Sequence, residues 1–276
     1  MNLIVQGASL ADAHLRDLAA LSGAQRSERL GDAACRLYAA QPHADIAAYC
    51  ARARLDFAFV PPGRRLADMR LLAIDMDSTL ITIECIDEVA DLAGLKAEVS
   101  AITAAAMAGE LDYAQSLRRR VALLQGLEES ALARVYDERL RLSPGAETLI
   151  AAARHAGLKT LLVSGGFSFF TDRLKMRLGL DYSTSNTIEI EGGRLTGRVI
   201  GDIVDAAGKA AALRARRDEL GIAKSAAIAI GDGANDLAMM AEAGVSIAYR
   251  AKPLTRGKAD YALDYCGLDA VLNLFA

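Results

Sequence analysis

Two carboxylates stand two residues apart directly after an apolar run. Asp75 and Asp77 follow residues 71–74, Leu-Leu-Ala-Ile, a run that is typical of a short, fully buried strand. In an open parallel sheet, ligands bind where the strands end. One carboxylate there can act as a nucleophile while the second moves a proton, and the pair can hold a hard divalent cation such as Mg2+. The alternative is a solvated turn, because loops are often rich in Asp and Ser.

A second strand end offers groups that suit a phosphate. Ser164, Gly165 and Gly166 follow the apolar run 161–163. They present a hydroxyl and exposed backbone N–H groups ahead of a predicted helix, and such groups can cradle a phosphate. Ser-Gly-Gly is also a common turn, so this segment alone leaves both interpretations open.

A third strand end carries further oxygen ligands. After 228–230 comes Gly-Asp-Gly-Ala-Asn-Asp, in which Asp232, Asn235 and Asp236 supply hard oxygen atoms suited to Mg2+. In a dinucleotide fingerprint the position of Asp236 belongs to a third glycine, and its charge would repel a pyrophosphate. Nucleotide binding is therefore rejected.

Lys209 lies near the start of a predicted helix, where the helix dipole does not stabilise a positive charge. It is either a surface lysine or a cation that reaches a phosphoryl group.

Short apolar runs alternate with helical stretches from residue 70 onward. This alternation predicts an α/β fold, with a Rossmann-like parallel sheet covered by helices on both faces. Residues 187–200 predict a β-hairpin laid onto that sheet. The predicted strands are 71–74, 160–163, 226–230 and 245–248, and the predicted helices are 146–156, 168–178, 206–220 and 235–243.

One long segment, residues 84–142, breaks the alternation, and we call it the helical insertion. It contains helical patterns and no convincing strand, and it begins directly after the carboxylate loop. A helical cap at this place would cover the strand ends as a lid and shield the site from water. Ordinary helical packing is the alternative. The predicted helices are 85–93, 96–108, 113–124 and 128–139.

Residues 1–66 are predicted to form a separate small unit, which we call the N-terminal unit. Its predicted order is βαββαβ, with strands at 3–6, 27–30, 34–38 and 57–60 and helices at 9–21 and 44–53. The Pro-Pro-Gly at 61–63 ends the unit sharply. This α+β order resembles the ACT-type regulatory domain. Packing, oligomerisation as a homodimer and the sensing of an amino acid such as serine are all left open.

Bulk properties exclude several classes of protein. The chain has 276 residues, of which 53% are hydrophobic and 24% charged, and its net charge is −3. That balance does not predict a nucleic-acid partner. No apolar run approaches the roughly 18 residues that span a bilayer, so we expect no membrane association. Four well-separated cysteines without a CxxC pair suggest reduced thiols in the cytoplasm.

Taken in chain order, these motifs resemble those of the haloacid dehalogenase superfamily. Asp75/Asp77, Ser164, Lys209 and the cluster at 232–236 match all four of its motifs, and the match extends from residue 70 to the C-terminus. The resemblance implies a catalytic core of 67–83 and 143–276, with 84–142 as its cap. Within the superfamily, the phosphatases that act on phosphoserine are the most similar. The residues that carry this similarity are 75–79 (Asp-Met-Asp-Ser-Thr), Glu84, 107–109 (Met-Ala-Gly), Tyr113 (often Phe in these enzymes), 116–117 (Ser-Leu) and 120–121 (Arg-Val).

The resemblance implies a role for each of these residues in a two-step phosphoryl transfer, the last step of serine biosynthesis. Asp75 would attack phosphorus, and Asp77 would protonate the leaving serine oxygen and then activate water. Mg2+ would be held by Asp75, the Asp77 backbone carbonyl and Asp232, with support from Asp236. The expected substrate contacts are Ser164, Gly165, Gly166 and Lys209 at the phosphoryl group, Glu84 at the ammonium, Arg120 at the carboxylate, Asn235 to orient the site, and Met107 and Tyr113 to close the pocket.

Two other activities are weighed against this expectation. The same chemistry could act on another small phosphate ester. Glu84 and Arg120 favour phosphoserine instead, because they match the opposite charges of a zwitterion. A non-enzymatic signalling module could accept phosphate on Asp75, but such modules lack a helical insertion and a following general acid. Asp77 also favours hydrolysis, because ATP-driven pumps of the superfamily carry no carboxylic acid at that position.

Overall fold

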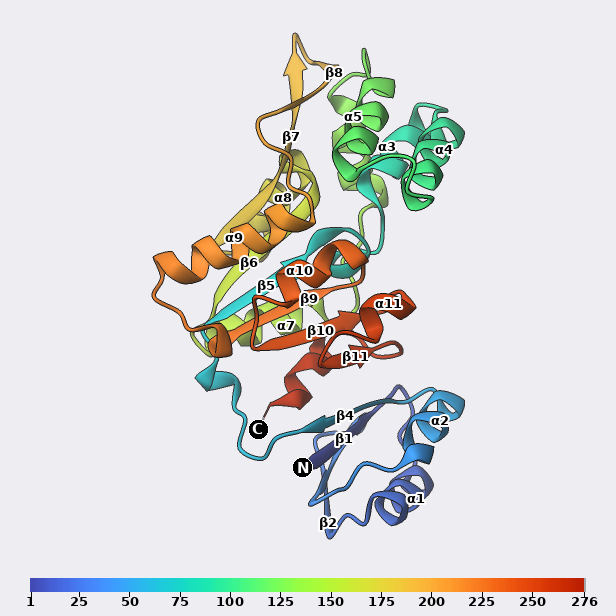
Figure 1. Ribbon diagram of the computed structural model, residues 1–276, viewed down its shortest axis with the longest axis vertical. Coiled ribbons are helices and arrows are strands. Elements are labelled where there is room, and N and C mark those ends of the chain that lie inside the picture. Colours follow the sequence, from blue (N-terminus) through green and yellow to red (C-terminus); the bar gives the residue numbers. More distant parts are fainter. Residues whose placement is uncertain (276) are drawn as a thin grey trace.

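The computed structural model describes residues 1–275, which are built around two β-sheets (Figure 1). The larger sheet has seven strands in the order β11-β10-β9-β5-β6-β7-β8. All of its pairings are parallel except that of β7 with β8. The strands are β5 (Leu71–Asp75), β6 (Lys159–Phe167), β7 (Tyr182–Glu191), β8 (Arg194–Ile200), β9 (Ala227–Gly231), β10 (Val245–Tyr249) and β11 (Tyr261–Leu263).

The central strand β5 is apolar up to its last residue, Asp75, because both of its faces are covered. It pairs with β9 on one side and β6 on the other. Leu72 and Ile74 join one hydrophobic cluster, whereas Leu71 and Ala73 join the cluster on the opposite face. Successive side chains of a strand point to opposite faces, so the part of β5 that lies between the two helical layers, residues 71–74, is apolar at every position.

Helices cover both faces of this sheet, as predicted. Leu149 of α7 (Ala146–His155) and Phe170 of α8 (Ser168–Leu178) belong to one cluster. Leu213 of α9 (Ala206–Glu219) and Met239 of α10 (Leu237–Met240) belong to the other. The predicted helix at 235–243 is shorter than expected at both ends: a 3₁₀ turn occupies residues 234–236, and α10 ends at Met240. A short helix, α11 (Pro253–Arg256), was not predicted.

The predicted hairpin is present, but its first strand is longer than expected. The first half of β7 pairs in parallel with β6, and its second half pairs with β8. The hairpin reaches beyond the sheet and lies beside α5 (Figure 1). There the Gly126 N–H donates to the Leu195 carbonyl at 2.8 Å, and the Leu195 N–H donates to the Leu127 carbonyl at 2.8 Å. The hairpin is thus hydrogen-bonded to the helical insertion.

The helical insertion leaves the core after β5 and returns before α7. An isolated bridge between Ile81 and Leu142 holds its two ends together. At the start of α5, the Asp112 and Gln115 side chains each bond the other residue's backbone N–H, which satisfies donors that a helix start leaves free. Its helices are α3 (Cys85–Leu92), α4 (Lys96–Met107), α5 (Tyr113–Leu123) and α6 (Ser130–Arg134), followed by a turn over Val135–Arg139.

The N-terminal unit has the predicted βαββαβ order and an antiparallel sheet of order β2-β3-β1-β4. Its first helix begins at Asp12, later than predicted, with Ala11 before it and no side-chain cap. The similarity to ACT-type domains stays a prediction. The elements are β1 (Asn2–Gln6), α1 (Asp12–Ser22), β2 (Arg26–Arg29), β3 (Ala34–Tyr38), α2 (Ala44–Ala53) and β4 (Asp56–Val60).

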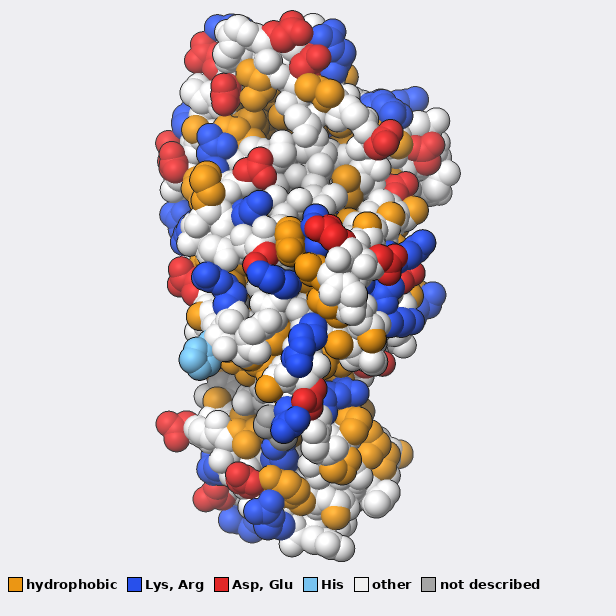
Figure 2. All heavy atoms as spheres, turned by 90° about the vertical axis from the view of Figure 1, so that its left-hand side faces the viewer, with side chains coloured by type: hydrophobic (Ala, Val, Ile, Leu, Met, Phe, Trp, Pro, Cys, Tyr) orange, Lys and Arg blue, Asp and Glu red, His pale blue; other side chains and the backbone are white. Residues whose placement is uncertain are grey.

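The outer surface is mixed in charge on the face that includes α9. Acidic and basic side chains are interspersed there, with scattered hydrophobic side chains between them (Figure 2). This mixture agrees with the small net charge of the chain. Within residues 1–275, no helix combines the length and the apolar character that crossing a bilayer requires.

Candidate active site

Asp75 ends β5 and is 4% exposed. The chain then turns sharply through residues 76–80, where Ser78 has a φ of 57°. A residue with a side chain rarely adopts this left-handed region, and such strain persists only where the surroundings fix it. Here the Ser78 hydroxyl donates to Glu84 Oε1 at 2.7 Å, and its N–H donates to the Ile83 carbonyl at 3.2 Å. The turn therefore fixes Glu84 relative to the carboxylates.

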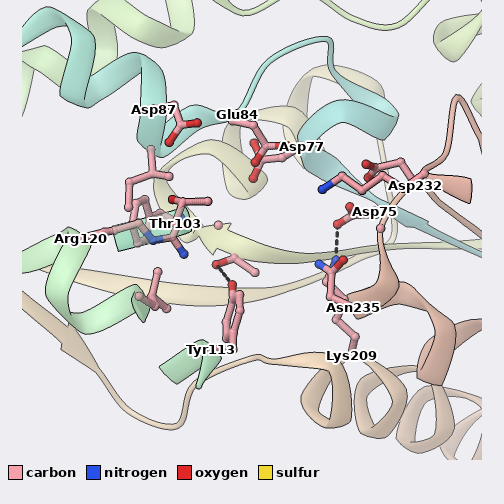
Figure 3. A pocket seen from close by; sticks show the side chains of 17 residues that line it. Asp75, Asp77, Glu84, Asp87, Thr103, Tyr113, Arg120, Lys209, Asp232 and Asn235 are labelled. Atoms are coloured by element: carbon pink, nitrogen blue, oxygen red, sulfur yellow. Dashed lines mark hydrogen bonds and ion pairs between the residues drawn. The ribbon is translucent and has the colours of Figure 1, made fainter. Parts of the chain in front are cut away.

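Lys209 connects three segments that are far apart in the sequence. It lies in the first turns of α9 and is 1% exposed. Its Nζ donates to Asp75 Oδ1 at 2.5 Å (Figure 3). It also donates to Asp236 Oδ1 at 2.8 Å. Burial opposes its charge, but the two carboxylates outweigh that effect and raise the pKa of Lys209. Lys209 is therefore a charged group of the site and not a surface lysine.

Three carboxylates gather at the ends of β5 and β9. Oxygen atoms of Asp75, Asp232 and Asp236 lie within 4.8 Å of one another. Burial and then the charge of Asp236 raise the pKa of Asp232 to about 6. Lys209 supplies one positive charge against three carboxylates, and hard oxygen donors with excess negative charge suit a divalent cation such as Mg2+. The donor set thus fits a metal ion.

Asp77 lies beyond Asp75 with its carboxylate turned toward the start of α3. The Cys85 N–H donates to Asp77 Oδ1 at 3.1 Å, which fixes the side chain. Burial, followed by the charge of Glu84, raises the pKa of Asp77 to about 7. A carboxyl group with such a pKa can both give and take a proton near neutral pH.

The Ser164-Gly165-Gly166 segment forms a tight wall of the pocket. The Gly166 N–H donates to Ser164 Oγ at 2.8 Å. A Cβ on Gly165 would lie 2.1 Å from the Tyr113 hydroxyl, and one on Gly166 would lie 2.8 Å from Asp77 Oδ2. Only glycine lets the backbone approach these groups so closely.

The helical insertion completes the pocket. Tyr113 donates from its hydroxyl to the Gly165 carbonyl at 2.9 Å, so α5 contacts the core directly. Arg120 also lines the pocket, and its buried Nε has no hydrogen-bond partner among the described residues. Met107 lies elsewhere, with 76% of its surface exposed, and does not line the pocket. Its role in closing the site stays a prediction.

The pocket has a volume of about 340 Å³ and is lined by most of the residues that the sequence indicated. Asp75, Lys209, Asp232 and Asn235 lie at one end, and Arg120 lies at the other (Figure 3). Asp77, Glu84, Tyr113, Gly165 and Gly166 also line it, whereas Ser164 and Asp236 lie buried just behind the wall.

Several pocket residues were missed by the sequence analysis. Asp87, Thr103 and Lys252 line the cavity. Asn186 is buried and donates from its amide to the Gly165 carbonyl at 2.7 Å, and Thr79 donates to Asp232 Oδ1 at 3.2 Å. Asp87 could have been found, because it lies in the first turn of the helix that begins directly after Glu84.

Comparisons with known proteins match both parts of the chain. The family model of haloacid dehalogenase-like hydrolases matches residues 72–241, and a model for a domain of unknown function, DUF4072, matches residues 3–46. The phosphoserine phosphatase of Albidiferax ferrireducens is 55% identical over 222 residues, which cover 79% of this chain and 93% of that protein. The phosphoserine phosphatase of a Polaromonas species is 56% identical over 218 residues, or 77% of this chain and 92% of that protein.

A solved structure is similar over nearly the whole chain. The probable phosphoserine phosphatase from Vibrio cholerae, in its unliganded form, has a TM-score of 0.88 and 39% sequence identity. The comparison covers 99% of this chain and 86% of that one. Both the N-terminal sheet and the larger sheet are therefore included in the similarity.

Proposed function

The chain belongs to the haloacid dehalogenase-like hydrolase family, and from that premise we propose that it is a phosphoserine phosphatase, which hydrolyses O-phosphoserine to serine and inorganic phosphate. One observation carries the assignment of the site. Lys209 holds Asp75 and Asp236 together at one end of a pocket, and the other end contains Arg120, whose buried Nε has no hydrogen-bond partner within residues 1–275. An anion-binding end and a carboxylate-binding end thus share one cavity.

In the first step, Asp75 is the nucleophile. Lys209 bonds Asp75 Oδ1, so the free oxygen, Oδ2, attacks phosphorus and forms an aspartyl-phosphate. The bond between phosphorus and the serine oxygen breaks, and Asp77 gives its proton to that oxygen. Serine leaves with a neutral hydroxyl, and Asp77 is left ionised.

In the second step, water replaces the enzyme carboxylate. Asp77 takes a proton from the water as the water oxygen attacks phosphorus, and the bond between phosphorus and Asp75 breaks. Inorganic phosphate leaves, Asp75 regains its charge, and Asp77 is again protonated. The backbone N–H of Cys85 holds Asp77 in place through both steps.

The charge of the phosphoryl group must be offset by cations and N–H groups. Lys209, the Ser164 hydroxyl and the Gly165 backbone N–H would hold its oxygens, and Asn235 would help to orient them. The Gly166 N–H, which was also expected to contribute, is donated to Ser164 Oγ instead. Ser164 already accepts the Gly166 N–H, so its own hydrogen is free to be donated. Asp75, Asp232 and the Asp77 backbone carbonyl would bind Mg2+, with Asp236 in support. Bound Mg2+ supplies positive charge that stabilises the transferring phosphoryl group.

The opposite end of the pocket would recognise the amino-acid part of the substrate. Arg120 would pair with the carboxylate and Glu84 with the ammonium. Placing both charges limits the substrate to a zwitterion of suitable length. We place the reaction in the cytoplasm, which agrees with the four free cysteines of the chain.

Release of phosphate from O-phosphoserine tests this proposal. We expect the wild type with Mg2+ to turn over phosphoserine, a chelator to stop it, and Asp75→Asn to abolish it while the variant stays folded by circular dichroism. Arg120→Ala should raise KM for phosphoserine far more than for an aryl phosphate, because only phosphoserine has a carboxylate. An equal rise in KM for both substrates would contradict the role of Arg120. Phosphate release by Asp75→Asn would contradict the assignment of Asp75 as the nucleophile.

A further inference from the structure

Two groups of opposite charge line the pocket without pairing with each other. The buried Nε of Arg120 has no partner among the described residues. The Asp87 carboxylate is influenced by the charges of Arg120 and Lys96, but within residues 1–275 it accepts no hydrogen bond. A partly buried charge without a partner is unfavourable. Such groups are typical of sites that are completed by a ligand.

The other acidic residues of α3 show that Asp87 is exceptional. Glu88 and Asp91 both pair with Arg139, each at 2.6 Å, and neither lines the pocket. Asp87 instead faces the cavity from the same side as Glu84 (Figure 3). Burial raises the pKa of Asp87, as expected for a carboxylate without a direct cation.

Glu84 is already partly engaged. Its Oε1 accepts the Ser78 hydroxyl at 2.7 Å, so one of its two carboxylate oxygens already bonds the turn after Asp75. An ammonium group has three N–H donors. One partly engaged carboxylate does not satisfy three donors. Glu84 directly precedes α3, Asp87 lies in the first turn of that helix, and both line the pocket, so Asp87 is well placed to contribute.

We propose that Asp87 is a specificity-determining residue that receives the substrate ammonium together with Glu84. This inference rests on the proposed function. It implies that the site rejects 3-phosphoglycerate, which has a hydroxyl where phosphoserine has its ammonium. That analogue carries one more net negative charge, which two carboxylates at this point repel, and its neutral hydroxyl offers one hydrogen where the ammonium offers three.

Substrates that lack one charged group each test the assignment. Phosphoethanolamine keeps the ammonium and lacks the carboxylate, whereas 3-phosphooxypropanoate keeps the carboxylate and lacks the ammonium. For Asp87→Asn we expect kcat/KM to fall about 10- to 100-fold on phosphoserine and on phosphoethanolamine, mainly through KM, because a charged hydrogen bond is lost. With 3-phosphooxypropanoate the value should stay the same or rise.

Two further variants separate charge from structure. Asp87→Glu keeps the charge and should recover most of the loss. Glu98→Gln removes an exposed carboxylate from α4, outside the pocket, and should leave all three substrates unchanged. Melting temperatures confirm that each variant is folded.

The outcomes distinguish this inference from the proposed function. If kcat/KM of Asp87→Asn falls only with the two substrates that carry a carboxylate, Asp87 positions Arg120 and the inference is overturned. An equal fall in kcat/KM with all three substrates, or no fall with any, would also overturn it. If the wild type releases no phosphate from phosphoserine, the proposed function itself fails.

Discussion

At the scale of single residues, Lys209 is the cation that joins two carboxylates of the site. Its ammonium lies between two carboxylates in a region with almost no exposure to water. Charges are expensive to bury unless they are paired, and removing one partner of a buried pair leaves the other uncompensated. Lys209 therefore contributes to both catalysis and stability.

Replacing Lys209 with methionine tests both contributions. We expect Lys209→Met to lower kcat about 10²- to 10³-fold, as the loss of one charge-stabilising donor commonly does. The free energy of unfolding should fall by about 3–5 kcal/mol, because Asp75 and Asp236 lose their shared cation. Mg2+ should restore more of the melting temperature in this variant than in the wild type. The exposed Lys258 gives a control, Lys258→Met, that should change neither quantity. A variant as stable as the wild type and equally responsive to Mg2+ would contradict this view.

Much of the site could be predicted because its residues follow apolar strands. Asp75 and Asp232 come directly after buried runs, and parallel strands bring their carboxyl ends to one edge. Asn186 gave no such signal. It is an isolated amide in a polar segment, and its role depends on the Gly165 carbonyl, which only the folded sheet brings near.

At the scale of elements, the first half of β7 shows why part of the sheet was missed. Residues 182–186 are Tyr-Ser-Thr-Ser-Asn, without the apolar run that identified the other strands. Hydrogen bonds replace apolar contacts between this strand and α8. Ser185 bonds Thr171 at 2.8 Å, and Ser183 donates to Asp172 at 3.2 Å. A strand stabilised in this way has no hydrophobic pattern to detect.

The start of β6 depends on the carboxylate of Asp181. Asp181 Oδ2 accepts the backbone N–H of Thr160 at 2.9 Å and its hydroxyl at 3.0 Å, and Lys159 donates to Oδ1 at 2.7 Å. Burial alone would raise the pKa of Asp181, but these donors outweigh it and lower the pKa below its ordinary value. The ionised form is therefore favoured in the folded protein.

Asp181→Asn should destabilise the protein by about 1–3 kcal/mol at neutral pH, because it weakens charge-assisted hydrogen bonds. A lowered carboxyl pKa contributes stability that is complete above the unfolded pKa of about 3.9 and disappears as the pH falls through the lower folded pKa. The difference between wild type and variant should therefore shrink below about pH 4. Urea unfolding at several pH values measures it. A difference that stays constant on acidification would contradict the assignment.

The hairpin of β7 and β8 supports the helical insertion at Gly197. This residue has a φ of 83°, and a Cβ there would lie 2.9 Å from the Gln125 Cβ and 3.4 Å from the Ala122 Cα. Gly201 has a similar φ of 78° and nothing within 4 Å. Gly197→Ala therefore combines backbone strain with a collision against the last turn of α5 and the residues that follow it, whereas Gly201→Ala brings strain alone.

We expect Gly201→Ala to cost about 1–2 kcal/mol and Gly197→Ala to cost more than that. Gly197→Ala should also raise KM for phosphoserine, because the displaced α5 carries Tyr113 and Arg120. Thermal unfolding and steady-state kinetics of the two variants measure these effects. Equal stability losses and unchanged KM values in both variants would show that the hairpin does not position the insertion.

At the scale of the whole molecule, the N-terminal unit and the catalytic core share one hydrophobic cluster. Ile4 and Val60 from the N-terminal sheet lie in the same cluster as Val271 and Leu274 near the end of the chain. Arg36 adds a polar contact, donating to the Phe275 carbonyl at 2.7 Å. These contacts support the packing role for the N-terminal unit. Assembly into a homodimer and amino-acid sensing stay predictions.

Asp56 is the main polar contact between the two parts. It is 3% exposed, and its carboxylate accepts backbone N–H groups from Asp264 at 2.7 Å, Tyr265 at 3.1 Å and Cys266 at 2.8 Å. Three donors on one carboxylate fix the loop after β11 against β4. Because those N–H groups lie in the junction, removing the carboxylate leaves them without their acceptor.

Asp56→Ala should lower the free energy of unfolding of the full chain by about 3 kcal/mol or more, since buried donors lose a charged acceptor. Asp32→Ala, which removes an exposed carboxylate from the same unit, should change it by less than about 0.5 kcal/mol. Urea unfolding followed by circular dichroism measures both. The wild type should unfold in one transition, because parts that share a core unfold together. Separate transitions in the wild type, or an Asp56→Ala variant as stable as Asp32→Ala, would show that the two parts are only loosely joined.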